Sequence, residues 1–355
     1  MEDAELFILP EVPTISNGEL GNDLQSKLDN KTKPIGALGR LENLALRIGL
    51  ILGNKNPELL QPQMLVCAAD HGLTAEGISA YPSDVTWQMV ENFLAGGAAV
   101  SVLSKQNNIS LNVVDCGVRH DFSPREGLII QKVSNGTANS LYEPAMSNEE
   151  CQKAMNNGMN ITLSLPGNAL LIGEMGIGNS SAAAMLLARL TNNDIASCAG
   201  SGTGMIRSDL KKKISVLEKV LEKHKQATEP LEALAAFGGL EIATLAGAVI
   251  QAASERRVIV VDGFIASSAV LVASQIRPAV LDYCIFSHRS DEQGHSLMLN
   301  EMGTEPLLDL KLRLGEGSGA ALAWPLLMSA CAIIREMASF ETAGVSRDDD
   351  TKLIL

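Results

Sequence analysis

The 355-residue chain carries a formal net charge of −13 at pH 7, and 46% of its residues are hydrophobic although only 3% are aromatic. This acidity argues against nucleic acid and anionic membranes as partners, because both require a positive protein surface. The length allows one large domain or two smaller ones. Abundant Ala, Gly, Val and Leu are typical of repeated βα units, in which tight turns and closely packed helices favour small residues.

Helical patterns at the two ends of the chain predict a small helical domain built from both termini. The patterns lie in segments 37–52 and 319–340, outside the βα rhythm of the rest. We expect this domain to comprise residues 1–59 plus 306–355. We expect residues 60–305 to form a larger Rossmann-like α/β domain.

Short apolar runs in the larger domain predict six buried strands. The runs are apolar throughout rather than alternating, as expected where both faces of a sheet are covered. They are 64–70, 111–118, 168–176, 233–239, 257–264 and 279–288. Helical patterns separate them, so the fold class is α/β, with a doubly wound, mainly parallel sheet.

Each predicted strand ends in glycine or a polar residue, as in Asp70-His71-Gly72 and Asp262-Gly263. Ligands of open α/β sheets bind beyond the carboxyl ends of the strands, so these residues indicate a ligand site. Residues that merely turn the chain would explain some positions individually, but explain all six together less well.

The segment "GEMGIGNSS" (173–181) is close to a P-loop. Gly173 and Gly178 have the required spacing and Ser180 has the required type, but Asn179 replaces the lysine. Backbone N–H groups at the start of a helix favour an anion, so we expect a phosphate site here rather than a triphosphate site. The alternative is a plain tight βα turn.

Two further glycine-rich segments are candidates for chemistry. "CAGSGTGM" (198–205) is followed by Lys211–Lys213, which are either an anion partner or a solvated helix face. Glu316 lies between Gly315 and Gly317, directly before an apolar helix. Near apolar walls its pKa would rise and it could act as a general base. Alternatively, it is an acid favourable to the helix dipole.

Two other patterns raise the question of a metal. His288, Glu292 and His295 would share one helix face, but Ser287 and Gly294 make a continuous helix doubtful. Asp70 with His71 raises the same question, and we expect no metal in either place.

The remaining sequence features indicate a cytoplasmic protein. The six cysteines form no C-x-x-C pair and lie mostly in apolar runs, as expected of buried free thiols in a reducing compartment. The N-terminus lacks a signal-peptide pattern, and glycines and Glu241 interrupt the apolar region 231–253.

Taken together, these motifs resemble those of the nicotinate-nucleotide:dimethylbenzimidazole phosphoribosyltransferase family, which activates the lower-ligand base of cobamides. The matching segments run in family order over nearly the whole chain. They are "KPIGALGRLE" (33–42), 68–103, "VVDCGV" (113–118), "GEMGIGNSSAAA" (173–184), "GTGM…KKK" (202–213), "FGGLEIATLAGA" (237–248), "VDGFIASSA" (261–269) and 286–323.

The resemblance implies transfer of phosphoribose from nicotinate mononucleotide to an aromatic base, with inversion at the anomeric carbon. It also implies a Rossmann-like sheet, a homodimer, small-molecule substrates and no metal or cofactor. There are three alternatives: a homologue that uses adenine or a phenol, a pair of homologous subunits, and a non-catalytic nucleotide-binding paralogue. Retention of Glu174 and Glu316 argues against the paralogue.

The family roles transfer onto matching residues. Glu316 resembles the general base, and Glu174 a second carboxylate near the ribose. The other residues fall into four groups: the phosphate site (Gly176, Ser180, Lys213), backbone contacts to the nucleotide (Gly202, Gly204, Leu314), the nicotinate-carboxylate region (Gly263, Ser290) and the base pocket (Ser79, Tyr81, Gln88, with Met175 and Leu314 as apolar walls).

A few residues depart from the family pattern. Met205, Ile206 and Arg207 stand where the family commonly has acidic residues, and spacing from the next apolar run favours Lys213 as the family lysine. Ser318 replaces a usual Thr. Trp87 is bulkier than expected beside Gln88, and we expect it to affect the choice of acceptor base more than the chemistry.

Overall fold

The structure is a computed structural model that describes residues 7–200 and 207–346. Contacts divide the chain into two compact units. Unit 1 comprises Met1–Pro13 and Leu60–Ala323, and unit 2 comprises Thr14–Leu59 and Trp324–Leu355. The boundaries differ from the expected ones, since residues 1–13 and 306–323 fall in unit 1 rather than in the helical unit.

Unit 1 is built on a six-stranded sheet in which every described ladder is parallel. The strand order is β3-β2-β1-β4-β5-β6. The strands are β1 (Gln63–Ala69), β2 (Ser110–Gly117), β3 (Leu128–Ile130), β4 (Ala169–Met175), β5 (Val258–Val261) and β6 (Cys284–Phe286). The predicted parallel, doubly wound α/β fold is therefore confirmed, and the carboxyl ends of the strands meet at one edge.

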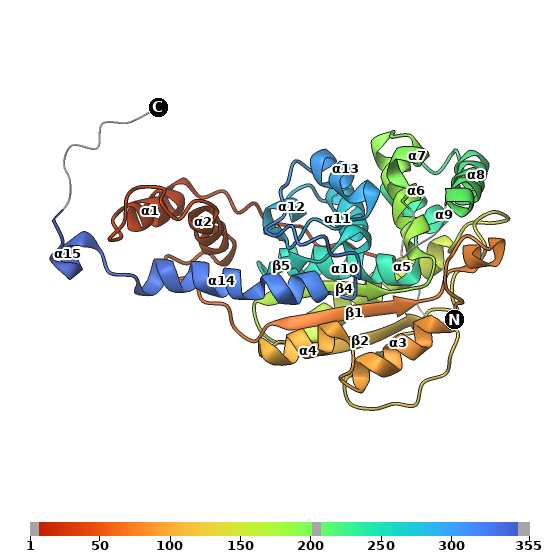
Figure 1. Ribbon diagram of the computed structural model, residues 1–355, viewed down its shortest axis with the longest axis horizontal. Coiled ribbons are helices and arrows are strands. Elements are labelled where there is room, and N and C mark those ends of the chain that lie inside the picture. The colour runs from red at the N-terminus through yellow and green to blue at the C-terminus, as the bar shows by residue number, and fades with distance from the viewer. Residues whose placement is uncertain (1–6, 201–206, 347–355) are drawn as a thin grey trace. The chain divides into compact units, whose positions relative to one another are not determined.

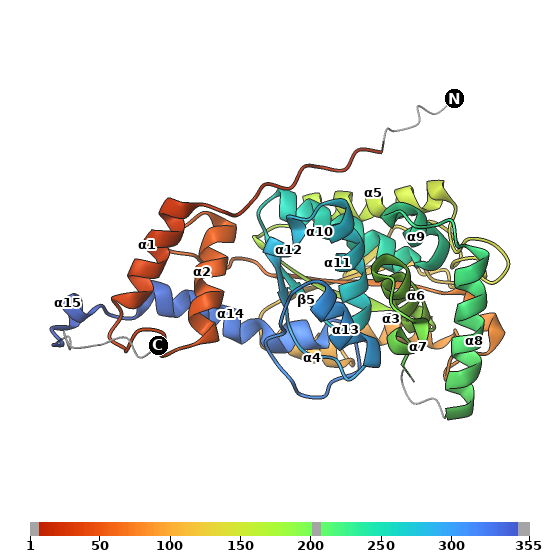
Figure 2. The ribbon, with the colours of Figure 1, turned by 90° about the horizontal axis from the view of Figure 1, so that it is seen from above.

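Helices cover both faces of this sheet (Figure 1). On one face lie α5 (Asn148–Ser164), α10 (Leu240–Ser254) and α11 (Phe264–Ile276), and on the other lie α3 (Val85–Leu94) and α4 (Ala99–Gln106). Figure 2 shows α10 and α11 side by side. The helices α5 and α10 pack closely because glycines leave room: a Cβ on Gly158 would lie 1.9 Å from the carbonyl oxygen of Thr244.

Shorter elements complete unit 1. They are η1 (Gly72–Glu76), α6 (Asn179–Thr191), α7 (Ile195–Cys198), α8 (Arg207–Lys223), α9 (Pro230–Phe237), α12 (Val280–Tyr283) and α13 (Gln293–Glu301). In α8, Leu217 and Val220 are buried.

One predicted strand is wrong and one observed strand was not predicted. Residues 233–239 belong mostly to helix α9, which begins at Pro230 and ends at Phe237. The helix is buried from Ala233 to its end, so its apolar run has no polar positions to reveal a helical period. Strand β3 has only three residues, of which Leu128 alone is buried, and so leaves little pattern to detect.

The six cysteines are confirmed as free and buried: Cys67, Cys116, Cys151, Cys198, Cys284 and Cys331. Cys67 lies on the central strand β1, where every residue is buried. These thiols behave as small hydrophobic side chains that help to fill the core.

Unit 2 contains α1 (Gly18–Asp29), α2 (Arg40–Leu52), α15 (Phe340–Ala343) and the greater part of α14 (Ser318–Glu336). Asn17 caps α1 by accepting a hydrogen bond from the backbone N–H of Leu20. In the turn before α2, the buried ammonium of Lys33 lies 2.9 Å from Glu42. The "KPIGALGRLE" segment thus contains a buried ion pair.

Among the described residues, α14 is the one helix long and apolar enough to cross a membrane by length and composition. This is weak evidence for a span, because 56% of its apolar stretch is buried inside the protein and a core helix passes the same test. It also contains Pro325.

Candidate active site

A cavity of about 370 Å³ lies at the carboxyl edge of the sheet in unit 1. It is bounded by the end of β4, the start of α6, the start of α11, helix α3 and two loops. The lining residues are Ser79, Tyr81, Val85, Met89, Glu174, Met175, Gly176, Ile177, Gly178, Asn179, Ser180, Gly263, Phe264, Ile265, Ser290, Glu292, Arg313, Leu314, Gly315 and Glu316. This volume suits a small organic ligand.

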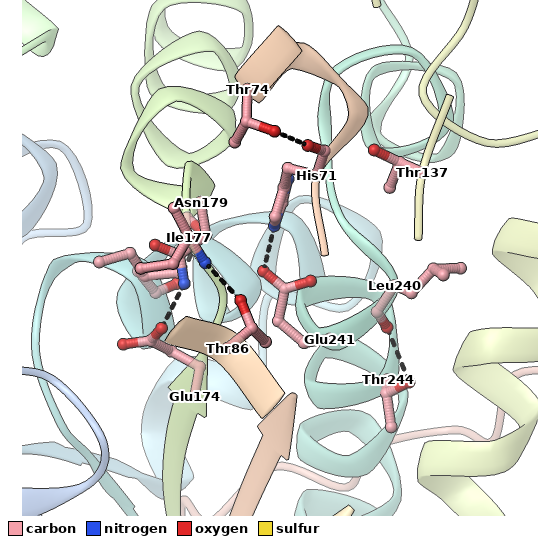
Figure 3. Close-up of polar contacts among 12 residues, drawn as sticks. His71, Thr74, Thr86, Thr137, Glu174, Ile177, Asn179, Leu240, Glu241 and Thr244 are labelled. Atoms are coloured by element: carbon pink, nitrogen blue, oxygen red, sulfur yellow. Dashed lines mark hydrogen bonds and ion pairs between the residues drawn. The ribbon is translucent and has the colours of Figure 1, made fainter. Parts of the chain in front are cut away.

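Glu174 lies near the end of β4 with its side chain in this cavity and only 5% exposed. Burial, followed by the negative charges of Asp262 and Glu241, raises its pKa to about 8. The amide Nδ2 of Asn179 donates a hydrogen bond to Glu174 Oε2 (Figure 3). The residue in the P-loop lysine position is therefore bound to a carboxylate.

Glu316 lies in a turn of unusual backbone geometry. Gly315, Glu316 and Gly317 have φ angles of +81°, +68° and +89°, a backbone region that residues other than glycine rarely adopt. The turn rests on β4, because a Cβ on Gly173 would lie 2.3 Å from the backbone nitrogen of Gly317. Burial and the charge of Asp262 raise the pKa of Glu316 to about 7.

The start of α6 forms another wall of the cavity. Gly178 caps the helix with φ +96°, and Ser180 follows in the first turn. The Nζ of Lys213, from α8, donates to Ser180 Oγ at 3.1 Å. Lys213 is 2% exposed, and burial lowers its pKa against the opposing effect of Glu292. Lys213 does not line the cavity and lies behind this wall, beside Ser180, where its ammonium group and the helix N-terminus together favour an anion.

The predicted base-pocket residues do not all reach the cavity. Ser79, Tyr81 and Met175 line it, but Gln88 does not and is exposed on α3. Val85 and Met89, on the same helix, line the cavity instead. The sequence did not indicate which face of α3, which begins at Val85, points into the cavity.

Trp87 makes a contact outside the cavity lining. Its ring stacks on that of His120, with centroids 4.8 Å apart and planes 14° apart. His120 in turn contacts Phe122 edge-on. The expected effect of Trp87 on base choice therefore has no support from the cavity lining.

Only some of the remaining predicted residues can be placed relative to the cavity. Gly263, Ser290 and Leu314 line the cavity, whereas Gly202 and Gly204 lie outside the described residues. Sequence reasoning missed the lining residues Asn179, Glu292 and Arg313, among others. Two of these three carried a signal: Asn179 occupies the P-loop lysine position, and Glu292 belongs to the metal-like pattern.

That pattern does not form a metal site. The Nδ1 of His295 accepts from the backbone N–H of Ser290 at 2.8 Å, and its Nε2 lies 3.1 Å from Ser267 Oγ. Burial followed by the charge of His288 lowers the pKa of His295 to about 3. Within residues 7–200 and 207–346, no group of three or more His, Cys, Asp or Glu side chains is arranged to hold a metal ion.

A buried pair lies behind the loop that follows β4. His71 Nε2 is 2.7 Å from Glu241 Oε1, as Figure 3 shows. In the same region, the side chain of Thr86 accepts a hydrogen bond from the backbone N–H of Ile177 at 3.2 Å. The loop is thereby tied to α3 from one side and bounded by the His71–Glu241 pair on the other.

Comparisons with known proteins identify relatives along most of the chain. A sequence profile of a family described as phosphoribosyltransferase matches residues 15–345. A protein of Variovorax paradoxus named nicotinate-nucleotide–dimethylbenzimidazole phosphoribosyltransferase is 65% identical over 341 residues, covering 96% of this chain and 98% of the relative. One of the same name from Dechloromonas aromatica is 52% identical, covering 94% and 97%.

A solved structure agrees with these matches. The crystal structure of the Thermus thermophilus protein with this name superposes with a TM-score of 0.89. It is 39% identical and covers 94% of this chain and 100% of that one.

Proposed function

Because the chain belongs to the phosphoribosyltransferase family that these relatives represent, we propose that it transfers phosphoribose from nicotinate mononucleotide to 5,6-dimethylbenzimidazole or a related base. The products are nicotinate and an α-ribosyl 5′-phosphate (α-ribazole 5′-phosphate with dimethylbenzimidazole), with inversion at C1′. The observation that carries this proposal is the pair of buried carboxylates, Glu174 and Glu316, in one cavity with an anion-favouring wall.

In this reaction Glu316 acts as the general base. The bond from C1′ to the pyridinium nitrogen breaks, and its electron pair leaves with nicotinate. A new bond forms between a nitrogen of the acceptor base and C1′, while Glu316 takes the N–H proton of the acceptor base. A pKa of about 7 suits this role, because the Glu316 carboxyl is ionised in about half of the molecules at neutral pH and its carboxylate still binds a proton well.

Glu174 stabilises the ribosyl ring as it becomes positively charged. Burial holds a proton on this carboxyl in the empty site, where its pKa is about 8. A cationic pyridinium or an oxocarbenium-like ring nearby favours the ionised form, so bound substrate would draw negative charge to this side of the ring. The hydrogen bond from Asn179 fixes the orientation of the carboxylate.

The phosphate of the substrate binds at the start of α6. Gly176 and the backbone N–H groups near Ser180 supply donors, and Lys213 supplies the positive charge that the missing P-loop lysine would give. A monophosphate needs no lysine that spans two phosphates. Gly202, Gly204 and Leu314 contribute backbone contacts to the nucleotide.

The acceptor base and the leaving group occupy the rest of the cavity. Ser79 and Tyr81 form the base pocket, with Val85, Met89, Met175 and Leu314 as apolar walls, and Gln88, which does not line the cavity, has no part in it. Gly263 and Ser290 lie at the nicotinate carboxylate, on the side where Arg313 also lines the cavity. We propose that the enzyme acts as a cytoplasmic homodimer or pairs with a homologous subunit.

One incubation tests the proposed reaction. The protein is mixed with nicotinate mononucleotide and, separately, dimethylbenzimidazole, adenine or a phenol, and released nicotinate is followed by chromatography. We expect release that depends on the added base, fastest with a benzimidazole. Release without any base would indicate a hydrolase, and binding without release would indicate a non-catalytic paralogue.

A further inference from the structure

The carboxylate of Asp262 lies directly beneath the turn that carries Glu316. Asp262 follows the last residue of β5 and is 1% exposed. Its Oδ2 accepts a hydrogen bond from the backbone N–H of Gly317 at 3.0 Å. Its Oδ1 accepts from those of Gly319 at 2.7 Å and Ala320 at 3.1 Å. One side chain thus satisfies three backbone donors at the start of α14, which lack partners within the helix.

These bonds hold a backbone that is unfavourable by itself. A non-glycine residue with φ +68° between two glycines of positive φ is strained and persists only where its surroundings impose it. The bond to Gly317 acts on the residue next to Glu316, and the bonds to Gly319 and Ala320 anchor the helix that follows. The support is therefore adjacent to the proposed base on its C-terminal side.

The turn is closely packed on two sides. A Cβ on Gly319 would lie 2.0 Å from His288 Cδ2 and 2.8 Å from Asp262 Oδ1. On the other side, Gly173 of β4 touches the backbone of Gly317. The turn is held between β4, the end of β5 and the segment after β6.

Asp262 also brings a buried negative charge to the site. The charged and titratable groups that face it are His288, whose Nε2 lies 3.6 Å from Oδ1, and the carboxyls of Glu174 and Glu316, on which its charge acts. His295 lies behind His288, with ring centroids 6.3 Å apart. Each of the two glutamates binds its proton more tightly because of this charge.

We propose that Asp262 is a positioning residue for the transfer reaction, which fixes the Glu316 turn through three backbone hydrogen bonds and places a buried negative charge beside it. The inference rests on the proposed function for the role of Glu316 in turnover. Asp262 itself does not line the cavity, so it acts through Glu316 and not on substrate.

The test compares Asp262→Asn with wild type in two measurements. The first is the titration of the Glu316 carboxyl in the substrate-free protein, by infrared difference spectroscopy against Glu316→Gln in the same background. Because a negative charge is removed, we expect the titration midpoint to fall by roughly one pH unit. The second is the pH profile of kcat/KM. Its acid limb should shift to lower pH by the same amount, while the maximum of kcat/KM drops roughly tenfold to a hundredfold.

Asp115→Asn is the matched control. Asp115 is also buried near the carboxyl end of a strand and accepts a backbone hydrogen bond, from Val118 at 2.8 Å, but its contacts are with Val118 and Lys132 rather than with the Glu316 turn. We expect it to leave the midpoint unchanged. An Asp262→Asn variant with the wild-type midpoint and kcat/KM within threefold of wild type would overturn the proposal.

A second variant keeps the test decisive if Asp262→Asn does not fold. His288→Gln retains all three hydrogen bonds and removes an imidazole whose pKa burial lowers but Asp262 raises by more, so that its protonated form partly neutralises Asp262. The Glu316 midpoint should then rise, and an unchanged or lowered midpoint would overturn the proposal. Both titrations are read without substrate, so absence of activity in wild type would reject the proposed function without deciding the role of Asp262.

Discussion

The imidazole of His71 and the carboxylate of Glu241 form a buried pair, 2.7 Å apart, against the loop that follows β4. A Cβ on Gly176 would lie 3.3 Å from both Glu241 Oε1 and His71 Nε2, and one on Gly239 would lie 2.4 Å from His71 Cε1. The pair fills the space that side chains at these two glycines would need. It therefore determines how closely the loop can approach β1 and α10.

Removing one partner of this pair should destabilise the fold. In Glu241→Ala the imidazole loses its buried hydrogen-bond partner, so we expect the free energy of unfolding to fall by roughly 1–3 kcal/mol. Glu241→Gln should lose less, because the amide oxygen still accepts a hydrogen bond from His71. Urea denaturation at pH 7 measures both. Glu222→Ala, at an exposed ion pair, is the control and should change stability by less than about 0.5 kcal/mol. Equal losses at positions 241 and 222 would contradict this account.

The pH dependence of turnover should report Glu316. A general base works when it is deprotonated and Glu174 acts in its ionised form, so kcat/KM rises with pH across their two pKa values, about 7 for Glu316 and about 8 for Glu174. Glu316→Gln should lower turnover by about a hundredfold or more and remove the step near pH 7, leaving the one near pH 8. Nicotinate release between pH 5.5 and 9 measures the profile, and isothermal titration measures binding of nicotinate mononucleotide, which should be largely retained. A flat wild-type profile or near-normal turnover in the variant would remove Glu316 from the base role.

Glu174 should make the substrate-free protein less stable at high pH. Its folded pKa, about 8, exceeds the ordinary 4.5, so between these values the unfolded chain loses a proton that the folded protein keeps. The stabilisation is complete below pH 4.5 and is lost as pH rises through 8. Glu174→Gln removes this effect, so we expect the variant to be more stable than wild type at pH 9 by roughly 1–4 kcal/mol and similar at pH 5.

Urea denaturation at the two pH values measures this difference. Glu222→Gln, at an exposed carboxylate, should show the same difference from wild type at both. A Glu174→Gln variant with no gain at pH 9 would show that the folded protein ionises this carboxyl as readily as the unfolded chain does.

The arrangement of the sheet edge was predictable because parallel strands place their carboxyl ends together. Glu174, from β4, and Glu316, from the loop before α14, are 142 positions apart in the sequence, yet both line one cavity. The strand pattern predicts the edge, but not the partners within it. That Asn179 binds Glu174, and that Lys213 reaches Ser180 from another helix, depends on side-chain geometry that spacing does not encode.

The errors also have physical causes. Residues 233–239 are apolar because α9 is buried, and an apolar run of that length fits a strand or a buried helix equally well. Gln88 was placed in the base pocket by resemblance, but on α3 it lies three positions after Val85 and one before Met89, and those two residues line the cavity. The rotation of α3 is set by the side chains that it buries, including Thr86, which is fully buried and accepts a hydrogen bond from the backbone N–H of Ile177.

The close contact between β4 and the Glu316 turn gives a final prediction. A Cβ on Gly173 would lie 2.3 Å from the nitrogen of Gly317 and 2.5 Å from the carbonyl carbon of Glu316, both of which are backbone atoms that cannot rotate away. Gly173→Ala should therefore displace the turn and lower kcat/KM by roughly a hundredfold. The strain should also cost about 1–3 kcal/mol of stability.

Binding separates this displacement from a general loss of structure. The added methyl group meets the Glu316 turn and not Ser180 or Lys213, so Gly173→Ala should bind nicotinate mononucleotide with an affinity within threefold of wild type. Gly21→Ala, within helix α1, is the control, because the nearest atom to a Cβ at this position is Leu50 Cδ2 at 4.0 Å. This change should stabilise the protein by about 0.5–1 kcal/mol without affecting turnover. Wild-type turnover in Gly173→Ala would mean that β4 and the turn can separate without moving Glu316 from its working position.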